Sequence, residues 1–220
     1  MIDPVFLAEA AVNGLLLGGV LALLALGLNL IFGVIDIVWI AYVDLVMICM
    51  YAVYFIVQVY GWPIWVGGLA SVALGALLGV SVHLLIITPI LTSAPVNQLL
   101  ATGGLLFFLQ SFATFLWTTD HRSVRLTLPR LELFDMPISV ARLIAFALSI
   151  LAMLGLYLFL SRTYIGTAIR AVSQDREAMA LMGANPQRVY LVTSAVGGAM
   201  AATAPSHGVR PKKFHSSVLV

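Results

Sequence analysis

The sequence predicts an all-α integral membrane protein that crosses the bilayer several times, and three observations predict this fold class. Hydrophobic residues make up 62% of the chain and charged residues only 9%, whereas roughly a quarter of the residues of a soluble domain are charged. The mean hydropathy is +1.08. Apolar runs of about 20 residues, the length that a helix needs to cross a bilayer, recur along the chain. We therefore expect a polytopic helical bundle.

Five long apolar segments define the expected membrane helices, and a weaker sixth follows them. Gly33 alone separates the first two, and one residue cannot carry the chain out of the membrane and back. Either the polar residues near Asp36 lie at the interface, or the second segment contains a broken or re-entrant helix, which is tolerated where it is buried or lines a cavity. The expected segments are about 6–32, 34–60, 64–90, 98–117 and 138–160, with the short sixth at about 189–204.

The basic residues indicate which loop faces the cytoplasm. All eleven lie between Arg122 and Lys213. The loop at 118–137 contains three arginines and the loop at 161–188 contains four, and they lie on opposite sides of the membrane because one helix joins them. Since cytoplasmic loops carry an excess of basic residues, we expect the 161–188 loop to be cytoplasmic, by a margin of one arginine.

Two pairs of glycines four residues apart lie within the apolar segments. They are Gly14 with Gly18 and Gly75 with Gly79. Small residues at this spacing let helix backbones approach closely. We expect tight packing within or between subunits, and a pathway lining is the alternative.

The polar stretch REAMALMGANPQR, residues 176–188, predicts a short helix at the membrane surface. We expect the helix to run from Ser173 to Gly183. Asp175 and Glu177 would lie in its first turn, where the helix dipole favours acids, and a glycine suits its C-terminal stop. Its narrow apolar face, at i, i+3 and i+4, would consist of Ala178, Leu181 and Met182. Such a helix could lie on the lipid interface or dock on a partner.

Two carboxylates lie in or near the second apolar segment. Asp44 would cost roughly 2.5–3.5 kcal/mol inside a span by insertion scales, so it should face protein or water. Asp36 precedes it by eight residues, about 80° around an ideal helix, so both could look into one cavity. Asp44 would then recognise a substrate amino group, or else make a structural hydrogen bond, and Asp36 could be interfacial. Thr102 and Gln110 could line the same path or join helices by hydrogen bonds.

The sequence contains no sign of an enzyme or of a cofactor of its own. We find no nucleophile–base arrangement, no basic nucleic-acid patch and no G-x-x-x-x-G-K-[ST] phosphate loop, so ATP would have to be bound by another subunit. His83 is alone on an apolar segment, so we expect no metal site there. A single cysteine, Cys49, excludes an internal disulfide.

Several motifs resemble one family. Glu177-Ala178-Met179 followed by Gly183 is similar to the EAA-x-x-x-G loop of ABC importer permeases. The wider stretch IGTAIRAVSQDREAMALMGANPQRVYLVT resembles that loop in branched-chain amino acid permeases. The stretches LLALGLNLIFGVID, AYVDLVMICMY and LATGGLLFFLQ resemble three further segments of these permeases, the last two matching A-H-G-D-F-V-M-L-G-A-Y and A-T-x-G-L-x-x-x-L-Q.

The resemblance implies the permease subunit of an ATP-driven importer in a bacterial inner membrane. Its implied partners are a second homologous permease, two cytoplasmic ATPases that bind the ATP, and a periplasmic substrate-binding protein. The 161–188 loop would be the coupling loop. Its helix would dock in a cleft of the ATPase through a set of residues that we expect to be Arg176, Glu177, Ala178, Leu181, Met182 and Gly183. The implied substrates are branched-chain or related amino acids, with amides and urea as further options.

The chain departs from the family pattern at two places. The family's His-Gly is here Tyr42-Val43 and a following glycine is Cys49, so larger side chains narrow this region. We expect a membrane domain at 1–204 and a divergent polar tail at 205–220, which suggests a frameshift or truncation after about residue 204. The alternatives are an ion-coupled carrier that uses Asp36 and Asp44, and a truncated permease without function.

Overall fold

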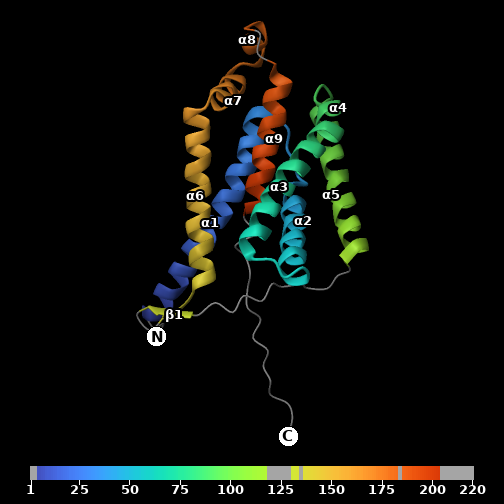
Figure 1. Ribbon diagram of the computed structural model, residues 1–220. Coiled ribbons are helices and arrows are strands. Elements are labelled where there is room, and N and C mark those ends of the chain that lie inside the picture. The colour runs from blue at the N-terminus through green and yellow to red at the C-terminus, as the bar shows by residue number, and fades with distance from the viewer. Residues whose placement is uncertain (1–3, 118–129, 134–135, 183–184, 204–220) are drawn as a thin grey trace.

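The computed structural model describes residues 4–117, 130–133, 136–182 and 185–203. It is a bundle of long helices that run between two ends of the molecule (Figure 1). The helices are α1 (Pro4–Ile35), α2 (Tyr42–Tyr54), α3 (Ile64–Val82), α4 (Thr88–Ile90), α5 (Pro95–Trp117), α6 (Val140–Arg162), α7 (Tyr164–Gln174), α8 (Arg176–Leu181) and α9 (Pro186–Thr203). Two π-helical turns, η1 (Phe55–Val59) and η2 (His83–Ile87), continue α2 and α3.

The described residues contain five helices that are long and apolar enough to cross a membrane, which confirms the predicted fold class. These spans are Glu9–Ile35, Tyr42–Val59, Ile64–Ile90, Pro95–Trp117 and Arg142–Arg162. The sixth expected segment is helix α9, which begins at Pro186, three residues earlier than expected. It starts with the Asn185 side chain accepting a hydrogen bond from the Gln187 amide (3.0 Å), and proline at the first helical position is typical of a helix start.

The first two segments are separated by a break in the helix, not by a single residue. Residues 36–40 are not helical, and the chain turns at the end of α1 and runs back along the bundle before α2 begins (Figure 1). Asp36 makes this reversal with a left-handed backbone (φ 64°), a conformation that aspartate and asparagine tolerate better than most residues. Its amide donates to the carbonyl of Phe32 (2.8 Å), which ends α1. The expected broken helix is therefore present.

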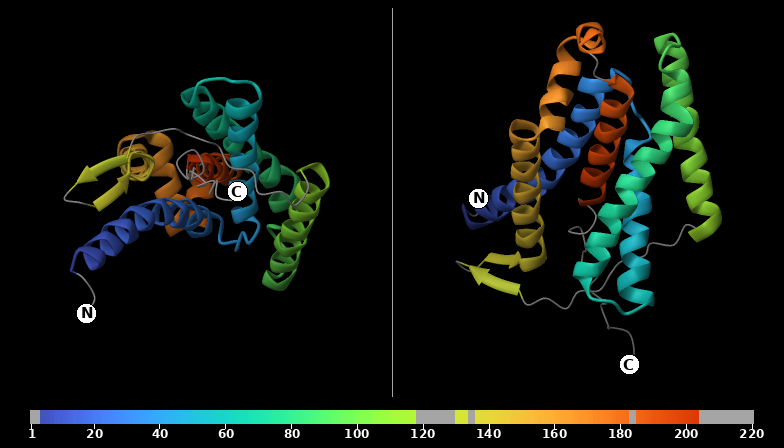
Figure 2. Two further views of the ribbon diagram at one scale, coloured as in Figure 1. Left: turned by 90° about the horizontal axis from the view of Figure 1, so that it is seen from below. Right: turned by 45° about the horizontal axis from the view of Figure 1, so that its top comes forward.

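Helix α9 lies in the middle of the bundle, with α1, α2, α3 and α6 around it (Figure 2). It packs on α3 through glycines. A Cβ on Gly75 would collide with the Gly198 carbonyl, and a Cβ on Gly79 with the Ser194 carbonyl. The predicted close packing of the Gly75–Gly79 pair is confirmed, whereas Gly14 and Gly18 have nothing within 4 Å of a built Cβ.

A two-stranded antiparallel hairpin, which the sequence analysis did not predict, precedes α6. It consists of β1 (Arg130–Leu133) and β2 (Met136–Ser139), with Arg130 opposite Ser139 and Leu133 opposite Met136. It lies beside the start of α1, at the end of the bundle opposite α8 (Figure 1).

The 161–188 loop contains two helices where one was expected, so the predicted helix from Ser173 to Gly183 is wrong at its start. Ser173 belongs to α7, and Asp175 interrupts the helix with an extended backbone (φ −152°, ψ 109°). Helix α8 begins after it, because the Asp175 carboxylate accepts a hydrogen bond from the Ala178 amide (3.0 Å). An acidic side chain in this position caps a helix start. Gly183 lies outside the described residues.

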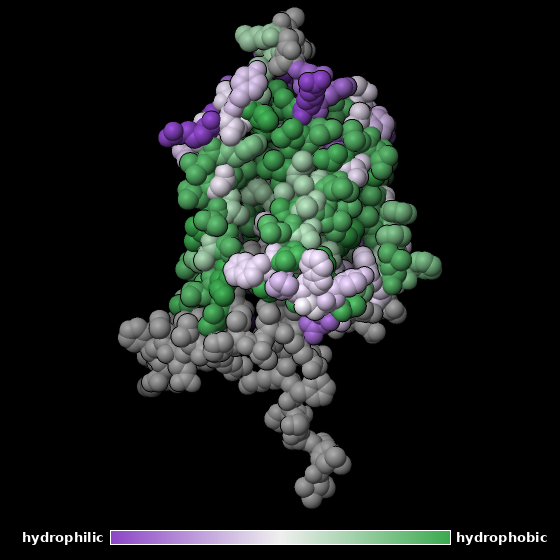
Figure 3. Space-filling model, viewed as in Figure 1, coloured by the Kyte–Doolittle hydropathy of each residue, from purple (hydrophilic) through white to green (hydrophobic). Residues whose placement is uncertain are grey.

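The surface has the layering of a membrane protein. Figure 3 shows an apolar band around the middle of the visible face, with the most hydrophilic residues above it near α7 and α8. Exposed aromatic residues lie at the turn between η1 and α3 on the opposite end, including Tyr60, Trp62 and Trp65. Tyrosine and tryptophan are enriched at membrane–water interfaces. This distribution fits a multi-pass membrane protein with α8 beyond the apolar band.

Candidate functional site

Helix α8 stands outside the bundle at the polar end, on a hairpin that α7 and α9 hold (Figures 1 and 2). Met182, just after the helix, is 82% exposed, whereas Met179 is partly buried against the core. Ala178 is half-buried. The backbones of Glu177 and Leu181 belong to α8, but their side chains are not among the described ones. The helix thus presents an uncovered methionine at the polar end.

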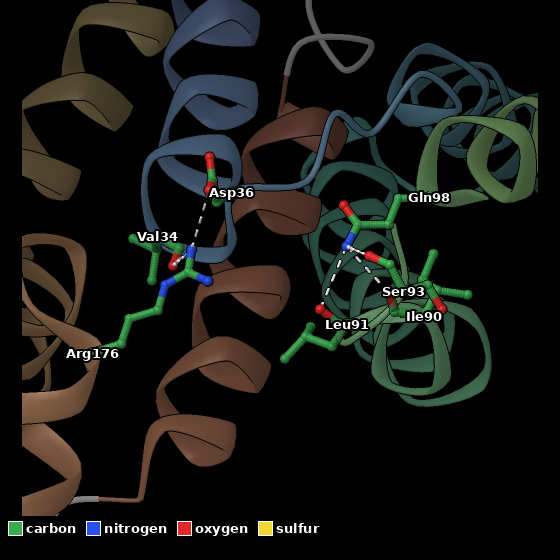
Figure 4. Close-up of polar contacts among 7 residues, drawn as sticks. All are labelled: Val34, Asp36, Ile90, Leu91, Ser93, Gln98 and Arg176. Atoms are coloured by element: carbon green, nitrogen blue, oxygen red, sulfur yellow. Dashed lines mark hydrogen bonds and ion pairs between the residues drawn. The ribbon is translucent and has the colours of Figure 1, made fainter. Parts of the chain in front are cut away.

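Arg176 points inward, toward the protein's own helices. Its Nη2 donates a hydrogen bond to the Val34 carbonyl (3.3 Å) and lies 4.0 Å from the Asp36 carboxylate (Figure 4). Its guanidinium carbon lies 5.7 Å from the ring centre of Tyr190, within the range of a cation–π contact. We expected Arg176 among the docking residues. The structure places its head group against the end of α1 and the start of α9.

An open cleft of about 390 Å³ lies beside Arg176 at this end of the molecule. It separates the C-terminal end of α1 from the C-terminal end of α7. The residues that line it are Phe32, Gly33, Asp36, Val172, Ser173, Gln174 and Arg176. An acidic and a basic side chain therefore share one surface cleft.

The turn between α4 and α5 is held at the same end of the bundle. The Gln98 amide nitrogen lies within hydrogen-bond distance of three carbonyl oxygens, those of Ile90 (3.2 Å), Leu91 (3.4 Å) and Ser93 (3.1 Å) (Figure 4). The amide has two hydrogens and so can bond two of these carbonyls at a time, and the Ile90 carbonyl also accepts from the Ser93 amide (3.0 Å). Carbonyls at a helix end lack intrahelical partners, so Gln98 helps to hold this turn.

Asp44 and Gln110, two of the predicted pathway residues, are brought together in the bundle. The Gln110 amide donates to Asp44 Oδ1 (3.5 Å), and Asp44 is 5% exposed. Its other oxygen, Oδ2, is buried and has no hydrogen-bond partner among the described residues. A buried polar oxygen without a partner costs free energy, on the order of 1–3 kcal/mol. Asp44 is therefore a costly residue in a packed region.

Thr102, the other predicted pathway residue on α5, contacts the segment that precedes α2. Its hydroxyl lies 3.1 Å from the Val38 carbonyl and 3.2 Å from the Leu99 carbonyl. Val38 is in the non-helical segment 36–41, where the backbone lacks helical partners. Thr102 thus joins α5 to the break between α1 and α2.

The expectation that Asp36 and Asp44 face one cavity from one helix is wrong. Residues 36–40 are not helical, so the spacing of an ideal helix does not apply. The Asp36 side chain is 74% exposed at the polar end, whereas Asp44 is buried. The two carboxylates have different surroundings and form no pair.

Buried polar contacts from Tyr42, Ser71 and His83 hold α9, and sequence reasoning did not identify them. The Tyr42 hydroxyl donates to the Gly197 carbonyl (3.1 Å), and Gly27 leaves room for this hydroxyl, because a Cβ there would collide with it. His83 Nδ1 lies 3.0 Å from the Ser194 hydroxyl. Tyr42 stands where the family pattern has histidine, which indicated that the residues around this position differ from those of the family. Only the fold shows that these residues are Gly27 and Gly197.

Among the residues that the structure describes, no group of three histidine, cysteine or acidic side chains could hold a metal ion. His83 is instead buried and bonded to Ser194. Polar side chains of the bundle thus join its helices, as in the Asp44–Gln110 pair and the contacts of Arg176 with Val34 and Asp36.

These features define a class of protein. Several membrane-crossing helices surround a small-residue central helix, with a buried carboxylate inside and a short helix outside the bundle, as in a polytopic transport protein. The family model of the permease component of branched-chain amino acid transport systems matches residues 10–207. The chain belongs to this family, which confirms the resemblance found in its motifs.

Curated relatives agree with this assignment. The high-affinity branched-chain amino acid transport system permease protein LivH of Escherichia coli is 28% identical over 210 residues, which cover 87% of this chain and 67% of LivH. LivH of Salmonella typhimurium gives the same values. The corresponding permease protein BraD of Pseudomonas aeruginosa is 26% identical over 210 residues, covering 89% of this chain and 68% of BraD.

No solved structure matches the chain.

Proposed function

We propose that the chain is a permease subunit of an ATP-driven importer for branched-chain or related amino acids in a bacterial inner membrane. It would work with a second homologous permease, two cytoplasmic ATPases and a periplasmic substrate-binding protein. ATP would be bound by the ATPases, because the chain has no phosphate-binding loop. Family membership supports the transport role.

One observation carries the coupling part of this proposal. Helix α8 projects beyond the bundle at the polar end, and Met182 beside it is 82% exposed. A short helix beyond the apolar band, between α7 and α9, lies where a partner outside the membrane could reach it. Force applied to α8 would reach α7 and α9, which flank it in the chain. We infer that α8 is the coupling helix and that its end of the molecule is cytoplasmic.

Asp44, with Gln110 and Thr102 beside the helix break, is the part of the proposed pathway that the buried geometry supports. A carboxylate with one unpartnered oxygen suits the ammonium group of an amino acid, since a charged donor makes the stronger hydrogen bonds. Asp44→Asn should lower uptake at least about tenfold, the equivalent of one charge-assisted hydrogen bond. Association with the ATPases should not change.

Co-purification with the ATPases encoded beside this gene tests the coupling role. We expect Met182→Arg to lose most of the bound ATPase, because a charge would enter an apolar contact. Glu177→Arg with Gly183→Asp should lose it as well, because the charge at position 177 is reversed and a carboxylate replaces a residue without a side chain. Asn97→Arg is the matched control, since Asn97 is exposed in the first turn of α5, at the same end but away from α8. Unchanged ATPase binding by both α8 variants would contradict the coupling role. Uptake by this chain alone, driven by a proton or sodium gradient, would instead make it an ion-coupled carrier.

A further inference from the structure

The Arg176 cluster joins three elements through one side chain. We define it as Arg176, Val34, Asp36 and Tyr190. The guanidinium donates to a carbonyl in the last turn of α1, faces the Asp36 carboxylate and lies over the Tyr190 ring of α9. The C-terminal end of a helix carries partial negative charge, and the face of an aromatic ring attracts cations. All three contacts therefore favour the same positive charge.

The contact between α8 and the end of α1 runs through this side chain, beside an opening in the surface. The open cleft of about 390 Å³ lies between the end of α1 and the end of α7. Arg176, at the first position of α8, reaches the end of α1 beside this cleft (Figure 4). Removing the guanidinium would leave α8 without this polar connection to α1.

Behind the cluster lies the rigid interior of the bundle. Tyr190 is 4% exposed, and its ring centre lies 6.5 Å from that of His83, which is bonded to Ser194. A displacement that reaches Tyr190 therefore reaches α9, which contains it, and also His83 at the end of α3.

Asp36 leads from the cluster into the helix break. It ends α1 with its left-handed backbone and begins the segment 36–41. Within this segment Ile37, Trp39 and Ala41 are buried, and Thr102 bonds the Val38 carbonyl. Three residues after the segment comes Asp44. The segment is thus anchored by its alternate buried residues, whereas Val38 and Ile40 are exposed.

We propose that Arg176 is the positioning residue that transmits a displacement of α8 to the segment 36–41, and through it to the buried Asp44–Gln110 group. This inference rests on the proposed coupling role of α8. Arg176 moves with α8, and its contacts move Asp36 and the end of α1 with it. Without the guanidinium, α8 would move while the helix break stayed in place.

A first experiment measures the link in the isolated full chain, in detergent, without any partner. Hydrogen exchange of the backbone amides in 36–41 would be compared between the parent protein, Arg176→Met and Arg170→Met. Methionine keeps the length of the side chain and removes its charge, and Arg170 is an exposed arginine on α7 of the same hairpin. We expect exchange to rise about fivefold or more for Arg176→Met, the lower end of typical couplings between sites. Arg170→Met should match the parent.

Asp36→Asn separates the ion pair from the other contacts, because asparagine tolerates the left-handed backbone and lacks the charge. It should raise exchange less than Arg176→Met does, and the double variant should equal Arg176→Met, since groups that act through one contact are not additive. Equal exchange in Arg176→Met and in the parent, or additive effects in the double variant, would overturn the link.

A second experiment uses the complex with the ATPases and the binding protein. Arg176→Met should keep ATPase co-purification and ATP hydrolysis while uptake falls about fivefold or more, with Arg170→Met again unchanged. Loss of bound ATPase in Arg176→Met would make Arg176 a partner contact and overturn the proposal. If the parent chain itself binds no ATPase, the proposed function fails, and the exchange experiment still decides whether Arg176 holds the helix break.

Discussion

Helices α6 and α9 show opposite relations between sequence and position. Helix α6 is strongly apolar, and many of its large side chains are exposed on the outside of the bundle, among them Leu151, Leu154 and Tyr157. Helix α9 contains Gln187, Arg188, one serine and two threonines, yet it lies in the middle (Figure 2).

The difference has a physical reason. Lipid tails are as apolar as leucine, so a helix that faces lipid needs an apolar surface and gains little from being buried in protein. A helix surrounded by other helices needs small residues that let backbones approach, and polar groups that find partners there. In α9 these are Gly197 and Gly198, Ala201 and Ala202, and Ser194. In this bundle a helix less apolar than the five spans is therefore the one that the other helices surround.

The largest effect is expected from placing the same large side chain in each helix. Gly198→Leu would drive a Cβ into the Gly75 carbonyl. Backbone cannot yield as a side chain does, so the free energy of unfolding should fall by about 3 kcal/mol or more. Gly155→Leu on α6 is the matched control, because a Cβ there meets nothing within 4 Å. The free energy of unfolding of both variants can be measured in mixed detergent micelles by circular dichroism. Equal stability of the two variants would contradict the difference between α9 and α6.

A smaller effect is expected from removing a buried hydroxyl. Ser194→Ala leaves the buried His83 Nδ1 without its partner, which should cost about 1–3 kcal/mol. Ser161→Ala at the end of α6 removes an exposed hydroxyl that bonds the Leu158 carbonyl, and it should change stability by less than about 0.5 kcal/mol. The same unfolding measurement applies. A Ser194→Ala protein as stable as its parent would show that the contact contributes nothing.

The smallest effect concerns a single hydroxyl that joins α2 to α9. Tyr42→Phe removes the hydrogen bond to the Gly197 carbonyl but keeps the ring, so the loss should be about 1 kcal/mol. Tyr157→Phe on α6, where the tyrosine is 68% exposed, should have no measurable effect. Tyr42→His restores the family's residue and should destabilise more than Tyr42→Phe, since a shorter ring leaves space beside Gly27. A larger loss for Tyr157→Phe than for Tyr42→Phe would contradict this account.

The two glycine pairs show what a sequence pattern cannot predict about helix packing. Gly14–Gly18 and Gly75–Gly79 have the same spacing and the same kind of apolar surroundings in the sequence. The second pair meets the backbone of α9, whereas the first has nothing within 4 Å of a built Cβ. The spacing thus predicts that a close approach is possible, but not which helix makes it.

Local chemistry alone was enough to predict the membrane class, the five long spans and the existence of a short polar helix before the last apolar run. Length, hydropathy and helix-capping residues act within a few neighbouring residues, so these features can be read along the chain. The family motifs were readable for the same reason.

Only the tertiary structure decided the features that depend on residues far apart in the chain. Ideal helix spacing paired Asp36 with Asp44, but the helix break separates them and brings Asp44 to Gln110, 66 residues away. Arg176 was expected to face a partner, yet it meets the end of α1, 142 residues earlier. Helix α9 was expected to be a weak membrane span, and the structure places it in the middle of the bundle. A polar group's partner depends on which helices pack together, and packing in a membrane depends on shape and buried polar contacts that no single segment contains.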